Sequence, residues 1–227
     1  SVNFDALGFT SQAQGDLLYR DSSTWARLPA GTSGQFLKTQ GTGANPVWGS
    51  ISAGFEFVEK VTASSSSTVD IGDESNVVAG YDYEILMDGL DFSADQTTDC
   101  FLQFGTGSTP TYQTSSYQSQ GVYLLGSGVT AARKTGQSGI NFSTTNVNLG
   151  GATAGETVTM RAYIYSPASN RKTRAETVQF GDDSGGNFST NWSYGERDAA
   201  EVVTSFRIYP SSGTVDGDFI LVRRKIA

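Results

Sequence analysis

The sequence contains no histidine and a single cysteine, Cys100. The absence of histidine excludes the Ser-His-Asp and Cys-His arrangements of nucleophilic hydrolases. A single cysteine excludes an intrachain disulfide and a cysteine-based metal site. Cys100 alternates with Leu102 and Phe104, which is typical of a small residue in a buried strand. We therefore expect no catalytic residues of these two kinds, no metal and no cofactor.

Long apolar runs and extended basic clusters are also absent, and the cluster Arg223-Arg224-Lys225 is only three residues long. No stretch approaches the roughly 20 apolar residues that a membrane helix needs, and we expect no signal peptide. Only 17% of the residues are charged, and the net charge is −8. Because phosphate binding requires clustered lysine and arginine, this composition argues against nucleic acid as a partner and against membrane insertion. The predicted site of synthesis is a reducing cytosol.

What the sequence does contain is 27 glycines, many serines and threonines, and short apolar alternations. The side chains predicted to face inward are Tyr83, Ile85 and Met87 in one strand and Val158, Met160, Ala162 and Ile164 in another. About eight such strands, separated by turn signals, predict an antiparallel β-sandwich of jelly-roll type. The fold class is therefore all-β.

Residues 15–50 form two shorter alternations of a different kind. Strands at 15–20 and 24–28 flank an Asp-Ser-Ser turn, and strands at 35–40 and 46–49 flank a glycine-rich turn. The large apolar side chains of these hairpins are Leu17, Tyr19, Trp25, Phe36, Leu37 and Trp48. Isolated hairpins of this size are too small to bury them. We therefore expect the segment to wrap around copies of itself as an oligomerisation stalk.

The same segment resembles a known motif. Its GDLLYRD stretch, a spaced tryptophan, LPAGTSGQ and a closing PVW are similar to a motif that recurs, often in tandem, in bacteriophage tail-fibre and related virion proteins. The resemblance covers residues 15–50 of 227. It implies an intertwined trimeric fibre in which the motif links a virion-attached end to a distal domain. Only one copy is present, which indicates a short spike.

The chain is thus predicted to have three parts. Residues 1–14 carry Phe4, Leu7 and Phe9, which either insert into a capsid or tail protein as a virion anchor or pack on the trimer itself. Residues 15–54 are the stalk with its linker. Residues 55–227 are the distal β-sandwich, large enough for a core of its own.

Paired carboxylates are the remaining catalytic option, because two of them suffice to hydrolyse a glycoside. The candidate pairs are Asp182 with Asp183, Glu196 with Asp198, and Asp216 with Asp218. The first and third lie in glycine-containing segments where aspartate caps its own turn. We interpret them as turn formers and predict that the protein is not an enzyme.

Binding chemistry is concentrated in two stretches, 111–120 and 187–198, which we predict to be loops at one end of the sandwich. Sugars are bound by aromatic faces and by polar side chains that match their hydroxyls. The candidate glycan-binding residues are Tyr112, Tyr117, Trp192, Tyr194 and Arg197. The alternative is that these aromatic side chains pack their loop against the sandwich or against the trimer axis. A predicted basic loop at 170–174 is either solvated or meets an acidic group.

The resulting hypothesis is a non-enzymatic bacteriophage fibre or spike protein, assembled in the bacterial cytoplasm into the virion as a homotrimer. Its distal domain would attach the particle to host cell-surface polysaccharide. One alternative is a head fibre or capsid decoration protein with a mainly structural role. A second is a spike enzyme that degrades host polysaccharide.

Overall fold

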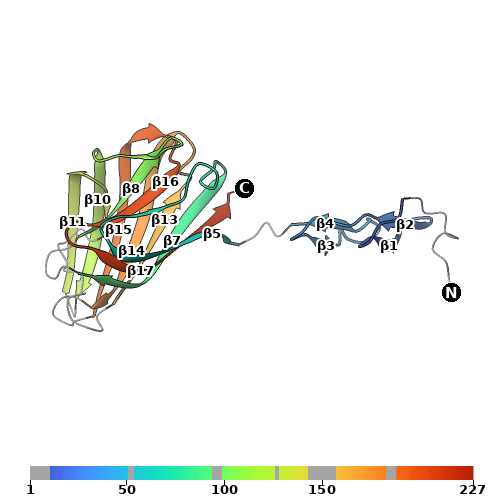
Figure 1. The fold of residues 1–227 in the computed structure, drawn as a ribbon, viewed down its shortest axis with the longest axis horizontal. Coiled ribbons are helices and arrows are strands. Elements are labelled where there is room, and N and C mark those ends of the chain that lie inside the picture. Colours follow the sequence, from blue (N-terminus) through green and yellow to red (C-terminus); the bar gives the residue numbers. More distant parts are fainter. Residues whose placement is uncertain are drawn as a thin grey trace. The chain divides into compact units, whose positions relative to one another are not determined.

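The computed structural model describes residues 11–50, 54–93, 99–125, 128–142, 157–182 and 188–226. The chain divides into two compact units, Ser1–Gly54 and Phe55–Ala227. In the described ranges every regular element is a β-strand, as Figure 1 shows. These ranges therefore contain no helix that could span a membrane.

The first unit consists of two hairpins, as predicted. Strand β1 (Leu17–Arg20) pairs with β2 (Trp25–Leu28), and β3 (Phe36–Lys38) pairs with β4 (Val47–Gly49), both antiparallel. The Asp21 carboxylate accepts the backbone N–H groups of Ser23 and Thr24 at 2.7 and 2.6 Å. These bonds fix the first turn and lower the pKa of Asp21.

Trp48 links the two hairpins, and Asp16 ties together the ends of the first hairpin. The Trp48 indole Nε1 donates to the Pro29 carbonyl at 2.6 Å, and a Cβ added to Gly31 would lie 2.7 Å from the Trp48 ring. The Asp16 carboxylate accepts the N–H groups of Ala13 and Ala30 and forms an ion pair with Arg27 at 3.3 Å. The first unit is thus held by capping bonds and one tryptophan.

The second unit contains two antiparallel sheets. The larger one has eight strands, in the spatial order β11 (Gly128–Gln137), β10 (Tyr117–Leu125), β15 (Phe188–Glu201), β14 (Arg171–Asp182), β13 (Val158–Tyr165), β7 (Tyr81–Phe92), β17 (Val215–Lys225) and β5 (Glu56–Ser66). The smaller one comprises β12 (Ile140–Asn141), β8 (Cys100–Thr106), β16 (Ser205–Pro210) and β6 (Val69–Ile71), with β9 (Thr111–Tyr112) paired to β8. Strands β11 and β5 are the edges of the larger sheet, and the pairing of β5 with β17 is interrupted by two register shifts.

The core lies between the two sheets, which gives the unit a sandwich-like architecture (Figure 1). All seven side chains predicted to face inward on β7 and β13 are buried, which confirms the alternation. The Phe206 ring of β16 lies 5.8 Å from that of Tyr83 on β7 and 6.4 Å from that of Phe104 on β8. Both distances are between ring centroids. The contact with Tyr83 joins the two sheets, and the contact with Phe104 lies within the smaller one.

Three segments predicted as loops are largely strands. Residues 111–120 include β9 and the start of β10, residues 187–198 fall largely in β15, and residues 170–174 fall largely in β14. In β15 the buried positions are polar, with Ser189, Asn191 and Ser193 facing inward. A strand with small polar residues inside and aromatics outside reverses the usual pattern, and this reversal is why residues 187–198 resemble a loop in the sequence.

Replacing Phe206 by alanine is expected to lower the free energy of unfolding by about 3–5 kcal/mol, because the ring is fully buried between the sheets. Phe57, whose side chain is 68% exposed, is the matched control. We expect Phe57→Ala to change the same quantity by less than about 0.5 kcal/mol. Denaturant unfolding measures both, and equal losses in the two variants would contradict this packing.

Candidate binding site

The outer face of the eight-stranded sheet, opposite the core, is built by rows of side chains that cross the strands. Antiparallel register places one residue from each neighbouring strand opposite the next. One such row, from β11 to β7, consists of Arg133, Gln120, Tyr194, Glu176, Tyr163 and Glu84. The adjacent row contains Ala131, Val122, Trp192, Val178, Arg161 and Leu86. Residues distant in the sequence therefore meet on one surface.

Aromatic side chains are the most prominent feature of this face. Trp192 and Tyr194, two residues apart on β15, are 49% and 50% exposed, and Tyr165 on β13 is similarly exposed. Large aromatics left open on a sheet provide flat apolar surfaces beside polar neighbours. This combination is typical of a binding surface.

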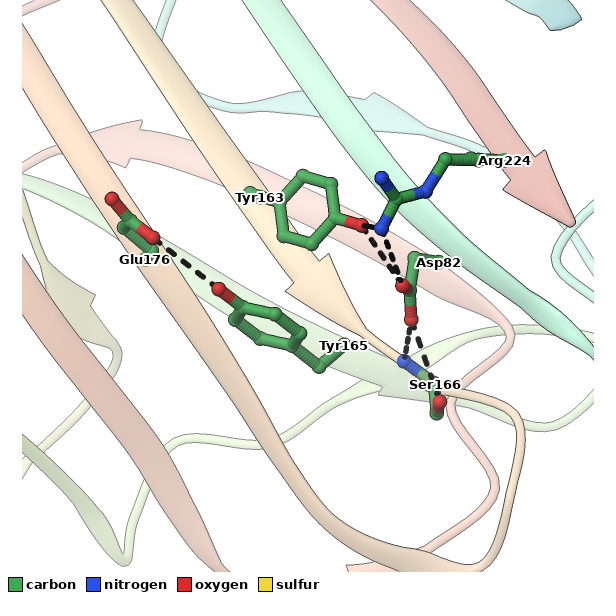
Figure 2. A network of polar contacts seen from close by, with 6 residues as sticks. All are labelled: Asp82, Tyr163, Tyr165, Ser166, Glu176 and Arg224. Atoms are coloured by element: carbon green, nitrogen blue, oxygen red, sulfur yellow. Dashed lines mark hydrogen bonds and ion pairs between the residues drawn. The ribbon is translucent and has the colours of Figure 1, made fainter. Parts of the chain in front are cut away.

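Glu176 connects two of these aromatics. The Trp192 indole Nε1 donates to Glu176 Oε1 at 2.7 Å, and the Tyr165 hydroxyl donates to Glu176 Oε2 at 3.2 Å. Figure 2 shows the contact between Tyr165 and Glu176. Burial and the nearby Glu176 carboxylate raise the pKa of Tyr165, so its hydroxyl stays protonated and remains a donor at neutral pH. One carboxylate thus orients both rings.

A second polar group lies beside Tyr194. Glu196 accepts from Arg174 Nε at 3.0 Å and from the Gln118 amide at 2.8 Å, and Arg133 donates to the Gln118 oxygen at 2.9 Å. The hydrogen bond from Arg174 is the main reason that the pKa of Glu196 is lowered. These linked side chains offer both donors and acceptors to a ligand on this face.

Two adjoining hollows lie over these residues. The central hollow, of about 710 Å³, is lined by Gln118, Ser119, Gln120, Arg133, Tyr165, Arg174, Ala175, Tyr194, Gly195 and Glu196. The Trp192 hollow, of about 620 Å³, is lined by Gln120, Gly121, Val122, Ala131, Ala132, Arg133, Trp192 and Tyr194. Both are open to solvent, and they share Gln120, Arg133 and Tyr194.

A third hollow, the Tyr163 hollow, lies farther across the sheet and measures about 330 Å³. Figure 2 shows the network that orders its wall. The Tyr163 hydroxyl donates to Asp82 at 2.8 Å and contacts Arg224, while Asp82 also accepts the Ser166 N–H at 2.9 Å. Burial and the bond to Asp82 raise the pKa of Tyr163. This network fixes a ring that is only half-buried.

The structure separates the five predicted glycan-binding residues. Trp192 and Tyr194 line the hollows. Tyr117 is buried in the core, where its hydroxyl accepts the Phe104 N–H at 2.8 Å. Arg197 is also buried and forms an ion pair with Glu201. Tyr112 lies on β9 under the Arg207 guanidinium, 3.8 Å from the ring centroid.

The position of Tyr117 and Arg197 has a simple cause. Successive side chains of a strand point to opposite faces. Tyr117 precedes the outward Gln118, and Arg197 follows the outward Glu196. Both therefore point toward the core, so they have no part in the outer face.

Sequence reasoning missed Arg133 and Glu176, whereas Gln118 and Arg174 fall in the stretches 111–120 and 170–174 that it singled out as segments. Gln118, Arg133, Arg174 and Glu176 lie on three strands whose mutual register is not encoded locally. Tyr165 lies on the outward side of β13, where it is exposed. The available signal was alternation: the outward positions include Arg161, Tyr163 and Tyr165 on β13, and Trp192, Tyr194 and Glu196 on β15.

In the first unit, the stalk residues differ in exposure. Leu17, Trp25, Phe36 and Leu37 are exposed, and the Trp25 side chain is 51% exposed. Tyr19 and Trp48 are half-buried. The three predicted anchor residues, Phe4, Leu7 and Phe9, lie outside the described residues.

The candidate catalytic carboxylates have structural partners where the structure describes them. Asp198 forms an ion pair with Lys172, and Asp218 accepts from Thr62 and Lys60 at 2.6 and 2.9 Å. These bonds lower the pKa of both carboxyls, as Arg174 does for Glu196. A general acid needs the opposite shift. Asp183 lies outside the described residues, and burial raises the pKa of the Cys100 thiol, which disfavours the nucleophilic thiolate.

Comparison of the chain with protein-family models, with curated proteins and with solved structures finds no match.

Replacing Glu176 by alanine is expected to free the Trp192 indole, because Glu176 is its hydrogen-bond acceptor. In ¹⁵N-labelled protein, the indole resonance that disappears in Trp192→Phe should shift in Glu176→Ala, and its hydrogen should exchange faster with solvent. Glu176→Gln, which keeps an acceptor oxygen, should shift it less. An unchanged Trp192 resonance in Glu176→Ala would contradict this contact.

Proposed function

We propose that this protein is a non-enzymatic fibre or spike component of a bacteriophage virion, whose second unit binds glycan on the host surface. The observation that carries the binding proposal is the pair of adjoining hollows lined by Trp192 and Tyr194. The virion assignment rests on the motif at residues 15–50 and its resemblance to bacteriophage fibre proteins.

The chemistry of the hollows supports a sugar ligand. A sugar ring has apolar C–H faces, which pack on aromatic rings, and hydroxyls that both donate and accept hydrogen bonds. Trp192 and Tyr194 supply the aromatic faces, while Gln118, Gln120 and Arg133 supply polar groups beside them. Both hollows are open, which suits the capture of one part of a long surface polymer.

The exposed apolar side chains of the first unit support assembly into a homotrimer. Hairpins that leave Leu17, Trp25, Phe36 and Leu37 open to solvent gain by covering them with another copy of themselves. In this proposal the N-terminal segment attaches to a capsid or tail protein of the virion. Weak glycan sites in three copies would reinforce one another, raising avidity by about 10²–10⁴ where all can engage together.

Replacing Trp192 by alanine is expected to weaken binding to immobilised bacterial surface polysaccharide by about tenfold, while the melting temperature stays unchanged, because the side chain is half exposed. Phe180→Ala is the matched control: the side chain is similarly exposed on the same face but lines none of the three hollows.

Three outcomes would count against this assignment. A large fall in melting temperature would make Trp192 a structural residue, and a change in oligomeric state would make the face a subunit contact. Absence of polysaccharide binding by the unmodified protein would leave a structural role, as a head fibre or capsid decoration, in its place.

The purified full chain is expected to sediment as a trimer. Trp25→Ala should dissociate it, because the side chain is 51% exposed within one chain and has apolar surface to bury against another. Trp48→Ala should instead destabilise the first unit itself, since Trp48 bonds to Pro29 in the same chain. Ser22→Ala, an exposed turn position, is the control. A monomeric wild-type chain in sedimentation equilibrium would contradict the prediction that residues 15–54 form a trimeric stalk.

A further inference from the structure

The three hollows of the outer face adjoin one another across the strands, and together they are called the trough. The central hollow shares Gln120, Arg133 and Tyr194 with the Trp192 hollow on one side, and Tyr165 with the Tyr163 hollow on the other. The trough therefore extends from β11 to β7, well beyond the pair of aromatics on which glycan binding was proposed.

The length of the trough is set by strand spacing. Residues of β11, β10, β15, β14, β13 and β7 line it. Neighbouring strands lie about 4.8 Å apart, so the five steps between these six strands span about 24 Å. A single sugar ring would leave most of this length empty, whereas an extended chain of several sugar units would occupy it.

The charges along the trough are balanced. Three arginines and three glutamates line it. Arg174 pairs with Glu196 at 3.0 Å, and Arg161 pairs with Glu84 at 3.3 Å. The other two are also engaged, since Arg133 donates to Gln118 and Glu176 accepts from Trp192 and Tyr165.

This balance of charges favours an uncharged ligand. A polyanion is recognised by cations that lie free to pair with it. Arg174 and Arg161 are paired with glutamates, and the charge of Arg133 is matched in number by that of Glu176. The chain as a whole carries a net charge of −8, which repels a polyanion at long range. Paired groups instead present donors and acceptors in alternation, which suits uncharged hydroxyls.

We propose that the ligand is an uncharged linear polysaccharide, bound across the strands over several sugar units so that it fills all three hollows. This inference rests on the glycan binding proposed above and adds the length and charge of the glycan. Each hollow contributes at least one aromatic ring: Trp192 and Tyr194 at one end, Tyr165 in the centre, and Phe55 and Tyr163 at the other end.

The test measures binding of the full chain to an array of size-graded fragments of bacterial surface polysaccharides, neutral and acidic, from disaccharide to octasaccharide. Neutral fragments should bind, and their dissociation constant should fall by about tenfold or more between the shortest and the longest. The affinity should change little with added salt, because no net charge is neutralised.

The outcomes separate this inference from the function on which it rests. Preference for acidic fragments, or an affinity independent of length, would overturn the inference and leave glycan binding intact. Absence of binding to every fragment would overturn glycan binding as well.

Two variants locate the far end of the site. Phe55→Ala should weaken binding of long neutral fragments by about threefold to tenfold and leave short ones unaffected, because the ring lines only the Tyr163 hollow. Phe57→Ala, more exposed and lining none of the hollows, should change neither. If Phe55→Ala leaves long fragments unaffected, the ligand does not reach the Tyr163 hollow.

Discussion

Cross-strand register in the eight-stranded sheet decides which side chains meet on its outer face. A shift of one residue between β14 and β15 would turn Glu176 toward the core, and the Trp192 indole and the Tyr165 hydroxyl would lose their common acceptor. The same shift would bring Thr177 outward, although it is fully buried in the observed register. The rows of aromatic and charged groups, and the hollows above them, therefore depend on this alignment.

The parts of the fold that could be predicted from the sequence are those in which local chemistry and burial agree. The alternation in β7 and β13 is apolar on one side and polar on the other, and the hairpins of the first unit have aspartate and glycine turns. Strand β15 was predicted as a loop because Ser189, Asn191 and Ser193 are buried while Trp192 and Tyr194 are exposed. Sequence patterning assumes that apolar residues are buried and polar residues exposed. In β15 the packing of the whole sheet produces the opposite distribution, so the pattern did not indicate a strand.

The candidate site could be predicted only in part, for a similar reason. Trp192 and Tyr194 are unusual in a polar segment, and the sequence alone singles them out. Their partners come from other strands, and Glu176, Arg133 and Gln118 become neighbours only once the sheet has formed. Tyr117 has a suitable side chain, but it points to the core because it lies one position before an outward residue. Which residues of the segment face outward cannot be assigned from the sequence without knowing that the segment is a strand.

The two edge strands of the large sheet, β11 and β5, carry features that disfavour pairing with another chain. An unpaired edge strand is a template on which another chain can add by backbone hydrogen bonds, which leads to aggregation. Strand β5 carries Glu56 and Lys60, and its pairing with β17 is interrupted by two register shifts; β11 carries Arg133 and Lys134. Charges and irregular pairing of this kind disfavour edge-to-edge association. Copies crowded together in an assembly would thus remain separate folded domains rather than merge into a continuous fibrillar sheet.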